Sequence, residues 1–177
     1  WNGAPWYADR AAVRTVTVEA GATTIGFAAF RDYANLTTVT LPDSVTSIGY
    51  QAFYGCTSLT EVTLPGSVTG IGSGAFTGCT SLTEVTLPDG VTGIGSGAFT
   101  GCTSLTEVTL SDGATGIGKG AFTGCCSLVR ITVQNRQCSI GDDATTIPDT
   151  ATIYGYSGST AETYAKAYNR IFVALDK

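Results

Sequence analysis

The chain has 177 residues, 43% of them hydrophobic, which is enough for one domain with a buried core. Its net charge is −5 and only 13% of its residues are charged, which argues against nucleic acid or an anionic membrane as partner, since both attract basic surfaces. No apolar run is long enough to span a bilayer, and the chain does not open on basic and then apolar residues, so we expect no signal peptide.

The N-terminal residues are unusually aromatic. Trp1, Trp6 and Tyr7 lie within the first seven positions, and such side chains are too apolar for a free tail. We therefore expect residues 1–15 to form an N-terminal cap, because a repeat array needs an atypical unit at each end. An exposed aromatic binding patch is the alternative.

From Val13 onward, apolar residues recur every 23 positions. The columns are Val13, Leu36, Leu59, Leu82, Leu105 and Leu128; Val16, Val39, Val62, Val85, Val108 and Ile131; Ile25, Ile48, Ile71, Ile94, Ile117 and Ile140; and Phe30, Phe53, Phe76, Phe99 and Phe122. A fixed period of this length predicts a solenoid in which each repeat is one coil. We expect the repeat array to cover residues 16–141.

Each coil predicts a short strand followed by a turn. Val62 and Leu64 are two residues apart, so both point into the coil, whereas Glu61 and Thr63 point outward. Pro65 has no N–H to donate and should end the strand.

The second half of each coil should return the chain to the first sheet. Ile71 and Gly72 predict a second extended segment, and residues 75–79 predict a compact helical turn. Gly78 is expected at positive φ, where glycine meets no steric penalty. The first coil is the least regular: Asp32 and Tyr33 stand where later coils have glycine and cysteine.

Residues 59–79 fit the pattern L-x-x-V-x-L-P-x-x-V-x-x-I-G-x-x-A-F-x-G-C, which resembles the BspA-like, Treponema-type leucine-rich repeats of bacterial surface proteins. Residues 5–21 and 152–165 resemble that family's N-terminal cap and C-terminal closure. The resemblance implies a right-handed β/α-type superhelix with parallel strands on one face, short strands and helical turns on the other, and terminal caps. It also implies a secreted or cell-surface protein, with adhesion as a role of some members.

Four of the six cysteines form one column of the repeat: Cys56, Cys79, Cys102 and Cys125. Side chains at one position of successive coils point the same way, which suits the disulfide torsion poorly. We expect buried free thiols that pack as small hydrophobic groups. Cys126 and Cys138 lie about half a coil apart, so their pairing stays open. Zinc is disfavoured, because the chain has no histidine and no C-x-x-C pair.

Residues 142–177 should form a C-terminal cap. We expect strands over residues 152–156 and 171–175 and, between them, one helix that starts with a capping box from Ser159 to Glu162. The helix and the last strand together should cover the edge of the solenoid. Asp142 and Asp143 could suggest a calcium site, but they lack the dedicated ligand loop that calcium needs, so we interpret them as solvated acids.

The outward positions of the strands are the best candidate binding residues, since solenoids commonly bind partners on an extended face. Three glutamates should stack one above another, with Arg130 beside Glu107 as the only relief of their repulsion. A solvated polar face is the alternative interpretation. The candidate residues are Thr38, Glu61, Thr63, Glu84, Thr86, Glu107, Thr109 and Arg130.

Catalysis is disfavoured, because the chain lacks a histidine base and its paired carboxylates should lie on an open face. We expect no cofactor and a monomer that binds a protein or glycan outside a bacterial cell. A structural spacer without a ligand is the second hypothesis, favoured by the near-identical coils. Specificity could reside in the irregular segments 31–33 and 50–54 and in the final coils.

Overall fold

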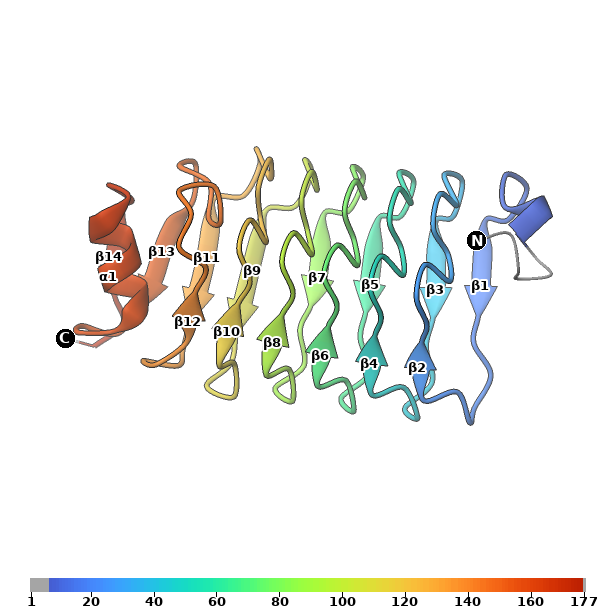
Figure 1. Ribbon diagram of the computed structural model, residues 1–177, viewed down its shortest axis with the longest axis horizontal. Helices are drawn as coiled ribbons and strands as arrows, with labels where there is room; N and C mark the ends of the chain where they lie inside the picture. Colours follow the sequence, from blue (N-terminus) through green and yellow to red (C-terminus); the bar gives the residue numbers. More distant parts are fainter. Residues whose placement is uncertain (1–6, 177) are drawn as a thin grey trace.

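The computed structural model describes residues 7–176. The chain winds into an elongated solenoid, with one row of short strands on each of its two long faces (Figure 1). All strand pairs are parallel, and from β1 to β12 most pairs join residues 23 positions apart. A repeat solenoid of leucine-rich type with coils of 23 residues, as the sequence predicts, is therefore confirmed.

The first row of strands forms what we call the strand face. Its members are β1 (Thr15–Thr17), β3 (Thr38–Thr40), β5 (Glu61–Thr63), β7 (Glu84–Thr86), β9 (Glu107–Leu110), β11 (Arg130–Val133), β13 (Thr152–Gly155) and β14 (Phe172–Ala174). Hydrogen-bonded ladders join β1 to β3, β5 to β7, and β9 through β11 and β13 to β14.

Proline sets the length of these strands. Pro65 and Pro88 follow three-residue strands directly after one further leucine, whereas β9 and β11 have four residues and are followed by Ser111 and Gln134. The amide of Gln134 donates to the carbonyl of Leu110 at 3.1 Å. Proline cannot make this bond, so the ladder stops one residue earlier in the coils that contain it.

The second row is one continuous sheet of very short strands. It consists of β2 (Thr24–Ile25), β4 (Ser47–Ile48), β6 (Gly70–Ile71), β8 (Gly93–Ile94), β10 (Gly116–Ile117) and β12 (Ser139–Ile140). Threonine hydroxyls beside this sheet add a further link between coils: Thr92 Oγ1 donates to the Thr69 carbonyl at 3.0 Å, and Thr115 Oγ1 to that of Thr92 at 2.9 Å.

The core lies between the two rows, where the apolar columns stack. Phe53, Phe76, Phe99 and Phe122 have no exposed surface. The same holds for two further columns, Leu59, Leu82, Leu105 and Leu128, and Cys56, Cys79, Cys102 and Cys125. Each ladder thiol also donates to a carbonyl of the preceding coil, as Cys79 Sγ does to Phe53 at 3.2 Å. Burial therefore leaves no thiol of the column without a hydrogen-bond partner.

The segments that follow the second row of strands, which we call the return segments, differ from the expected helical turns. In residues 74–79, alternate amides bond to the next coil: Gly74 to Ser96, Phe76 to Ala98 and Gly78 to Thr100. The intervening amides close turns to the residue three positions back. A helix would use every amide internally, so the turns at residues 75–79 do not form a helix. Gly78 has φ +74°, which confirms its expected conformation.

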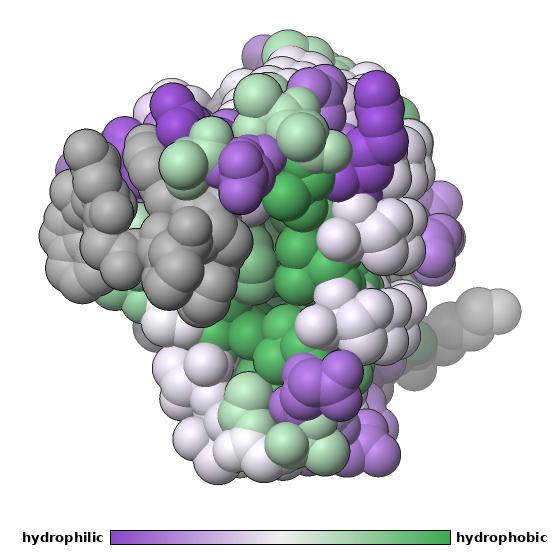
Figure 2. All heavy atoms as spheres, turned by 90° about the vertical axis from the view of Figure 1, so that its right-hand side faces the viewer, coloured by the Kyte–Doolittle hydropathy of each residue, from purple (hydrophilic) through white to green (hydrophobic). Residues whose placement is uncertain are grey.

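The N-terminal end of the core opens into an apolar pocket of about 580 Å³, lined by Val16, Val18, Ile25, Phe30 and other residues. Figure 2 looks onto this end and shows hydrophobic surface in its centre. The short 3-10 helix η1 (Tyr7–Asp9) lies nearby. Trp1 and Trp6, which we expect to cap this end, lie outside the described residues, and the side chain of Tyr7 is not described either.

The C-terminal end is covered on one side by α1 (Thr160–Ala167), which packs against β12 and β13. Ser159 caps the helix by accepting from the Glu162 amide at 3.2 Å. Glu162 in turn accepts from the amide of Gly158, at 2.6 Å, rather than from Ser159 itself. The expected capping box is thus present with its second bond shifted by one residue.

The last strand extends the strand face instead of covering its edge. β14 pairs with β13 and is the terminal strand of its sheet, so the expectation that helix and strand together cover the edge holds for α1 alone. Asp176 fixes the chain after β14: its carboxylate accepts from the Ser157 amide at 2.8 Å and pairs with Arg136 at 2.7 Å. The same two partners hold the pKa of Asp176 well below its usual range.

Tyr164 of α1 forms hydrogen bonds to the last coil. Its hydroxyl accepts from the Ile147 amide at 3.0 Å and donates to the Asp143 carbonyl at 2.8 Å. The Asp143 carboxylate accepts from Thr145 and pairs with Lys119 at 3.5 Å. Asp142 instead accepts from the Tyr168 hydroxyl, so the two acids face different partners.

Candidate binding face

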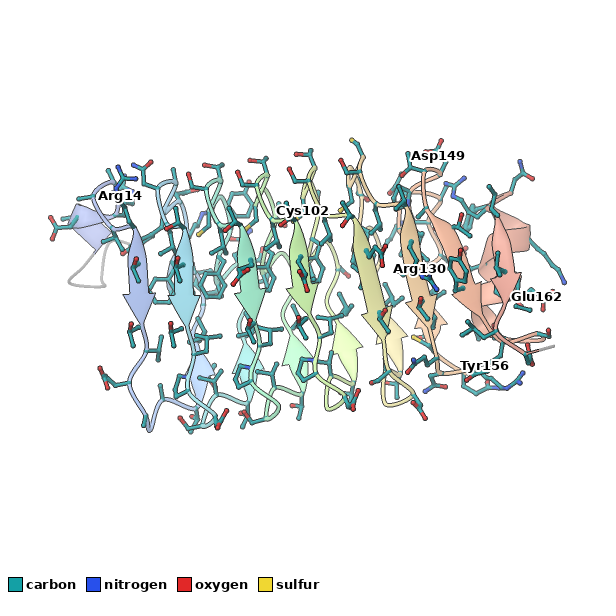
Figure 3. The ribbon with its side chains drawn as sticks, turned by 180° about the vertical axis from the view of Figure 1, so that it is seen from behind. Arg14, Cys102, Arg130, Asp149, Tyr156 and Glu162 are labelled. Carbon is teal, nitrogen blue, oxygen red and sulfur yellow. The ribbon has the colours of Figure 1, made fainter. Side chains whose placement is uncertain are left out.

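The candidate binding residues all lie on the strand face, on outward positions of β3, β5, β7, β9 and β11. The burial of these strands alternates: Glu61 and Thr63 are exposed, and Val62 between them is buried. β7 and β9 repeat this alternation. Figure 3 shows the face toward the viewer, with Arg130 near its C-terminal end. The predicted inward and outward sets are therefore correct in β5, β7 and β9, whereas in β11 the expected outward Thr132 is buried.

Three glutamates of the strand face, Glu61, Glu84 and Glu107, follow one another along neighbouring coils. Glu61 pairs in register with Glu84, and Glu107 pairs with Arg130. Parallel neighbours lie about 4.8 Å apart, so the carboxylates stand side by side. None of the ion pairs within residues 7–176 includes a glutamate of this row.

The expected relief by Arg130 is wrong. Its backbone lies beside Glu107, but its guanidinium stacks over the ring of Tyr154, 3.9 Å from the centroid. A guanidinium gains from the negative face of an aromatic ring, and Tyr154 of β13 offers that face on the other side of Arg130. Arg130 therefore stacks on Tyr154 instead of pairing with the row of glutamates.

A shallow groove of about 610 Å³ runs across this face between β7 and β9. The coils are spaced more widely here: the Thr106 amide lies 3.4 Å from the Thr83 carbonyl, whereas the equivalent bond from Thr83 to Thr60 is 2.9 Å. Glu84, Thr86, Glu107 and Thr109 line the groove together with backbone and turn residues. The groove thus contains the middle of the candidate set.

Sequence reasoning missed three residues of this groove: Asp89, Ser111 and Gln134. They come from the turns just after the strands, at or next to the position that proline occupies in earlier coils. The signal was the loss of proline at Ser111 and Gln134, which changes the end of the strand and the side chain presented there.

The cysteines are free, and all but Cys126 are buried. Burial raises the pKa of the Cys56 and Cys125 thiols to about 12 and that of Cys138 to about 11. A thiol is nucleophilic as its thiolate, so these groups do not suit covalent chemistry. The expected ladder of free thiols is confirmed, and Cys126 and Cys138 are not paired with each other.

No group of three or more potential metal ligands gathers within the part of the chain that the structure describes. Among the same residues, no helix has the length and apolar character that crossing a membrane requires.

Comparison with known proteins identifies the repeats. The pattern of the BspA type leucine rich repeat region matches residues 15–146 in six copies. No curated protein matches the chain.

Solved structures similar to this chain include two leucine-rich repeat proteins. A leucine-rich repeat protein from Bacteroides ovatus is 30% identical with a TM-score of 0.64, and the match covers 81% of this chain and 40% of that one. The leucine rich repeat protein of T. pallidum is 25% identical with a TM-score of 0.67, covering 90% of this chain and 85% of that one. The family pattern spans most of the array, and the chain belongs to the BspA-type leucine-rich repeat family.

Proposed function

We propose that the chain is a cell-surface or secreted binding module that holds a protein partner on its strand face. Membership of the BspA-type family supports a location outside the cell, because the repeats resemble those of bacterial surface proteins. The observation that carries the proposal is the row of Glu61, Glu84 and Glu107. Glu61 and Glu84 pair in register, Glu84 and Glu107 line a groove, and no ion pair within residues 7–176 includes any of the three.

The partner that fits this face presents basic side chains. Carboxylates placed side by side on an open surface repel one another, and a cation from a partner removes that repulsion when it binds. Threonine hydroxyls beside the row can both donate and accept hydrogen bonds. A basic segment lying along the groove would contact both chemical groups of the face.

The test is capture of extracellular-matrix proteins by the immobilised chain. Wild type is compared with a variant in which Glu61, Glu84 and Glu107 are all changed to lysine. The proposal expects a partner that wild type captures at physiological salt and the variant does not. Its capture should also weaken as salt rises, because exposed charges are screened.

A matched control separates the face from net charge. Glu19, Asp43 and Asp112 are exposed, lie off the strand face and join no ion pair within the described residues. Changing all three to lysine alters the net charge by the same amount. If both variants lose the partner equally, attraction by the row itself is refuted. If wild type captures nothing, the spacer hypothesis is favoured, which the near-identical coils between Leu59 and Thr103 support.

A further inference from the structure

A second surface, which lies away from the strand face, carries side chains that differ from those of the regular repeat. It lies on the return segments of the first two coils and comprises Phe27, Arg31, Tyr50, Gln51 and Tyr54. We call it the aromatic ridge. Later coils place small residues at the same positions: serine at 73 and 96, glycine at 74 and 97, and threonine at 77 and 100. The ridge is therefore built by substitutions confined to one end of the array.

Two aromatic rings of the ridge are stacked and exposed. Phe27 and Tyr50 lie 5.3 Å apart between centroids and 12° from parallel, with 43% and 48% of their surface exposed. Among the described residues, Phe27 is the only ring that stacks on Tyr50. The next coil has Ser73 at this position, so that coil supplies no ring there to stack on Tyr50.

Charged and amide side chains lie beside these rings. The Arg31 guanidinium lies over the ring of Tyr54, 4.4 Å from its centroid, and donates to the side-chain oxygen of Gln51. It also pairs with Asp32 at 3.4 Å. The cation thus has a carboxylate partner in Asp32, next to the ridge, unlike the acidic row of the strand face.

The backbone of the ridge is strained in a way that the repeat avoids. Ala28 and Gln51 have φ values of +50° and +53°, where the later coils place Gly74 and Gly97 at +65° and +63°. Side chains other than glycine rarely adopt this conformation. Strain of this kind is found at binding sites, where neighbouring structure maintains it. Gln51 keeps its side chain in contact with Arg31 at that cost.

We propose that the aromatic ridge binds a neutral saccharide, which stacks on the Tyr50 ring and hydrogen-bonds to Gln51 and Asp32. A sugar has an apolar C–H face that packs on an aromatic ring and hydroxyls at its rim, which suits a flat apolar surface with a few fixed polar groups. The pairing of Arg31 with Asp32 favours an uncharged ligand. A protein partner would bury a much wider surface than these few side chains provide.

The test is isothermal titration calorimetry with cellohexaose, chitohexaose and laminarihexaose as neutral probes. Sialyllactose and a heparin-derived hexasaccharide serve as charged probes. We expect at least one neutral probe to bind in the millimolar range or tighter. The Tyr50→Ser variant should weaken that binding by about tenfold or more through loss of the stacking ring. Serine occupies this position in two later coils, so the variant is compatible with the fold.

Further variants keep the result interpretable. Tyr50→Phe retains the ring and should keep the affinity within a few-fold, which shows whether Tyr50→Ser acts through stacking. Glu84→Lys alters only the strand face and should leave saccharide binding unchanged, so this inference and the proposed protein-binding face stand or fall separately. The proposal is overturned if no neutral probe binds, if only the charged probes bind, or if Tyr50→Ser binds as wild type does.

Discussion

The ring of Phe76 stacks on the ring of Phe99, with 5.3 Å between centroids and 6° between planes. The same relation joins Phe53 to Phe76 and Phe99 to Phe122. Residues separated by one period thus lie directly over one another, and the core is a set of parallel columns.

Two glycines of one short segment should respond oppositely to the same substitution. A Cβ at Gly72 would lie 2.6 Å from the backbone of Gly49 in the preceding coil, whereas a Cβ at Gly70 would meet nothing within 4 Å. Gly72→Ala should therefore destabilise the protein by about 1–3 kcal/mol through overpacking. Gly70→Ala should be neutral or stabilising by up to about 1 kcal/mol. Urea unfolding of both variants checks this, and equal effects would contradict the close stacking of coils.

One position of the return segment has a positive φ, and two opposite substitutions in different coils test it. Ala28 and Gly97 occupy it in different coils, at φ +50° and +63°. Ala28→Gly should raise the free energy of unfolding, and Gly97→Ala should lower it, each by about 1 kcal/mol, because a Cβ is unfavourable in this conformation. Thermal unfolding measures both. The same sign for both variants would show that the two coils differ in backbone conformation.

Thiol labelling should distinguish Cys126 from every other cysteine. It is the exposed one, while the remainder are buried. We expect a maleimide to modify one thiol in the native protein and all six after unfolding in denaturant, as counted by mass spectrometry. In the Cys126→Ser variant, native labelling should vanish. Rapid native labelling of Cys79 or Cys102 would show that the core opens at that column.

Stability should decline in alkaline solution because of the buried thiols. Burial raises the pKa of Cys56 and Cys125 from 9.0 to about 12. Above pH 9 the unfolded chain loses these protons while the folded chain retains them, so rising pH favours unfolding. The loss is on the order of 1.4 kcal/mol per pH unit for each thiol, and below pH 9 this contribution is constant.

The measurement is the free energy of unfolding between pH 8 and pH 11, in reducing buffer. A Cys56→Ala, Cys125→Ala double variant is the control and should show a shallower decline. If both proteins lose stability with the same slope, the two thiols are not responsible for it.

The sequence was sufficient to predict side-chain orientation and stacking wherever the 23-residue period is kept. Phe76, Cys79 and Leu82 recur without insertion from coil to coil, so their inward orientation and stacking follow from arithmetic on positions alone. The outward row of Glu61 and Glu84 was predictable for the same reason. Strict spacing converts one coil's pattern into contacts between coils.

Other features depend on departures from that spacing. Arg130 pairs in register with Thr152, which is 22 rather than 23 residues later. Counting in steps of 23 therefore could not predict that the ring of Tyr154 lies beside Arg130. The aromatic ridge was visible in part, since segments 31–33 and 50–54 are irregular, but the stacking of Phe27 on Tyr50 needed the conformation of both side chains. The helical turn expected at residues 75–79 does not form, because alternate amides of the segment bond to the next coil. Composition does not reveal which carbonyl an amide will bond to.

The register of the coils can be measured directly by nuclear Overhauser effects among the phenylalanine rings. In protein labelled selectively at phenylalanine, with assignments made by single Phe→Leu variants, we expect contacts to link Phe30, Phe53, Phe76, Phe99 and Phe122 in a single unbroken series. Absence of ring contacts between Phe53, Phe76 and Phe99, or a contact that skips one of them, would contradict the stacking of successive coils.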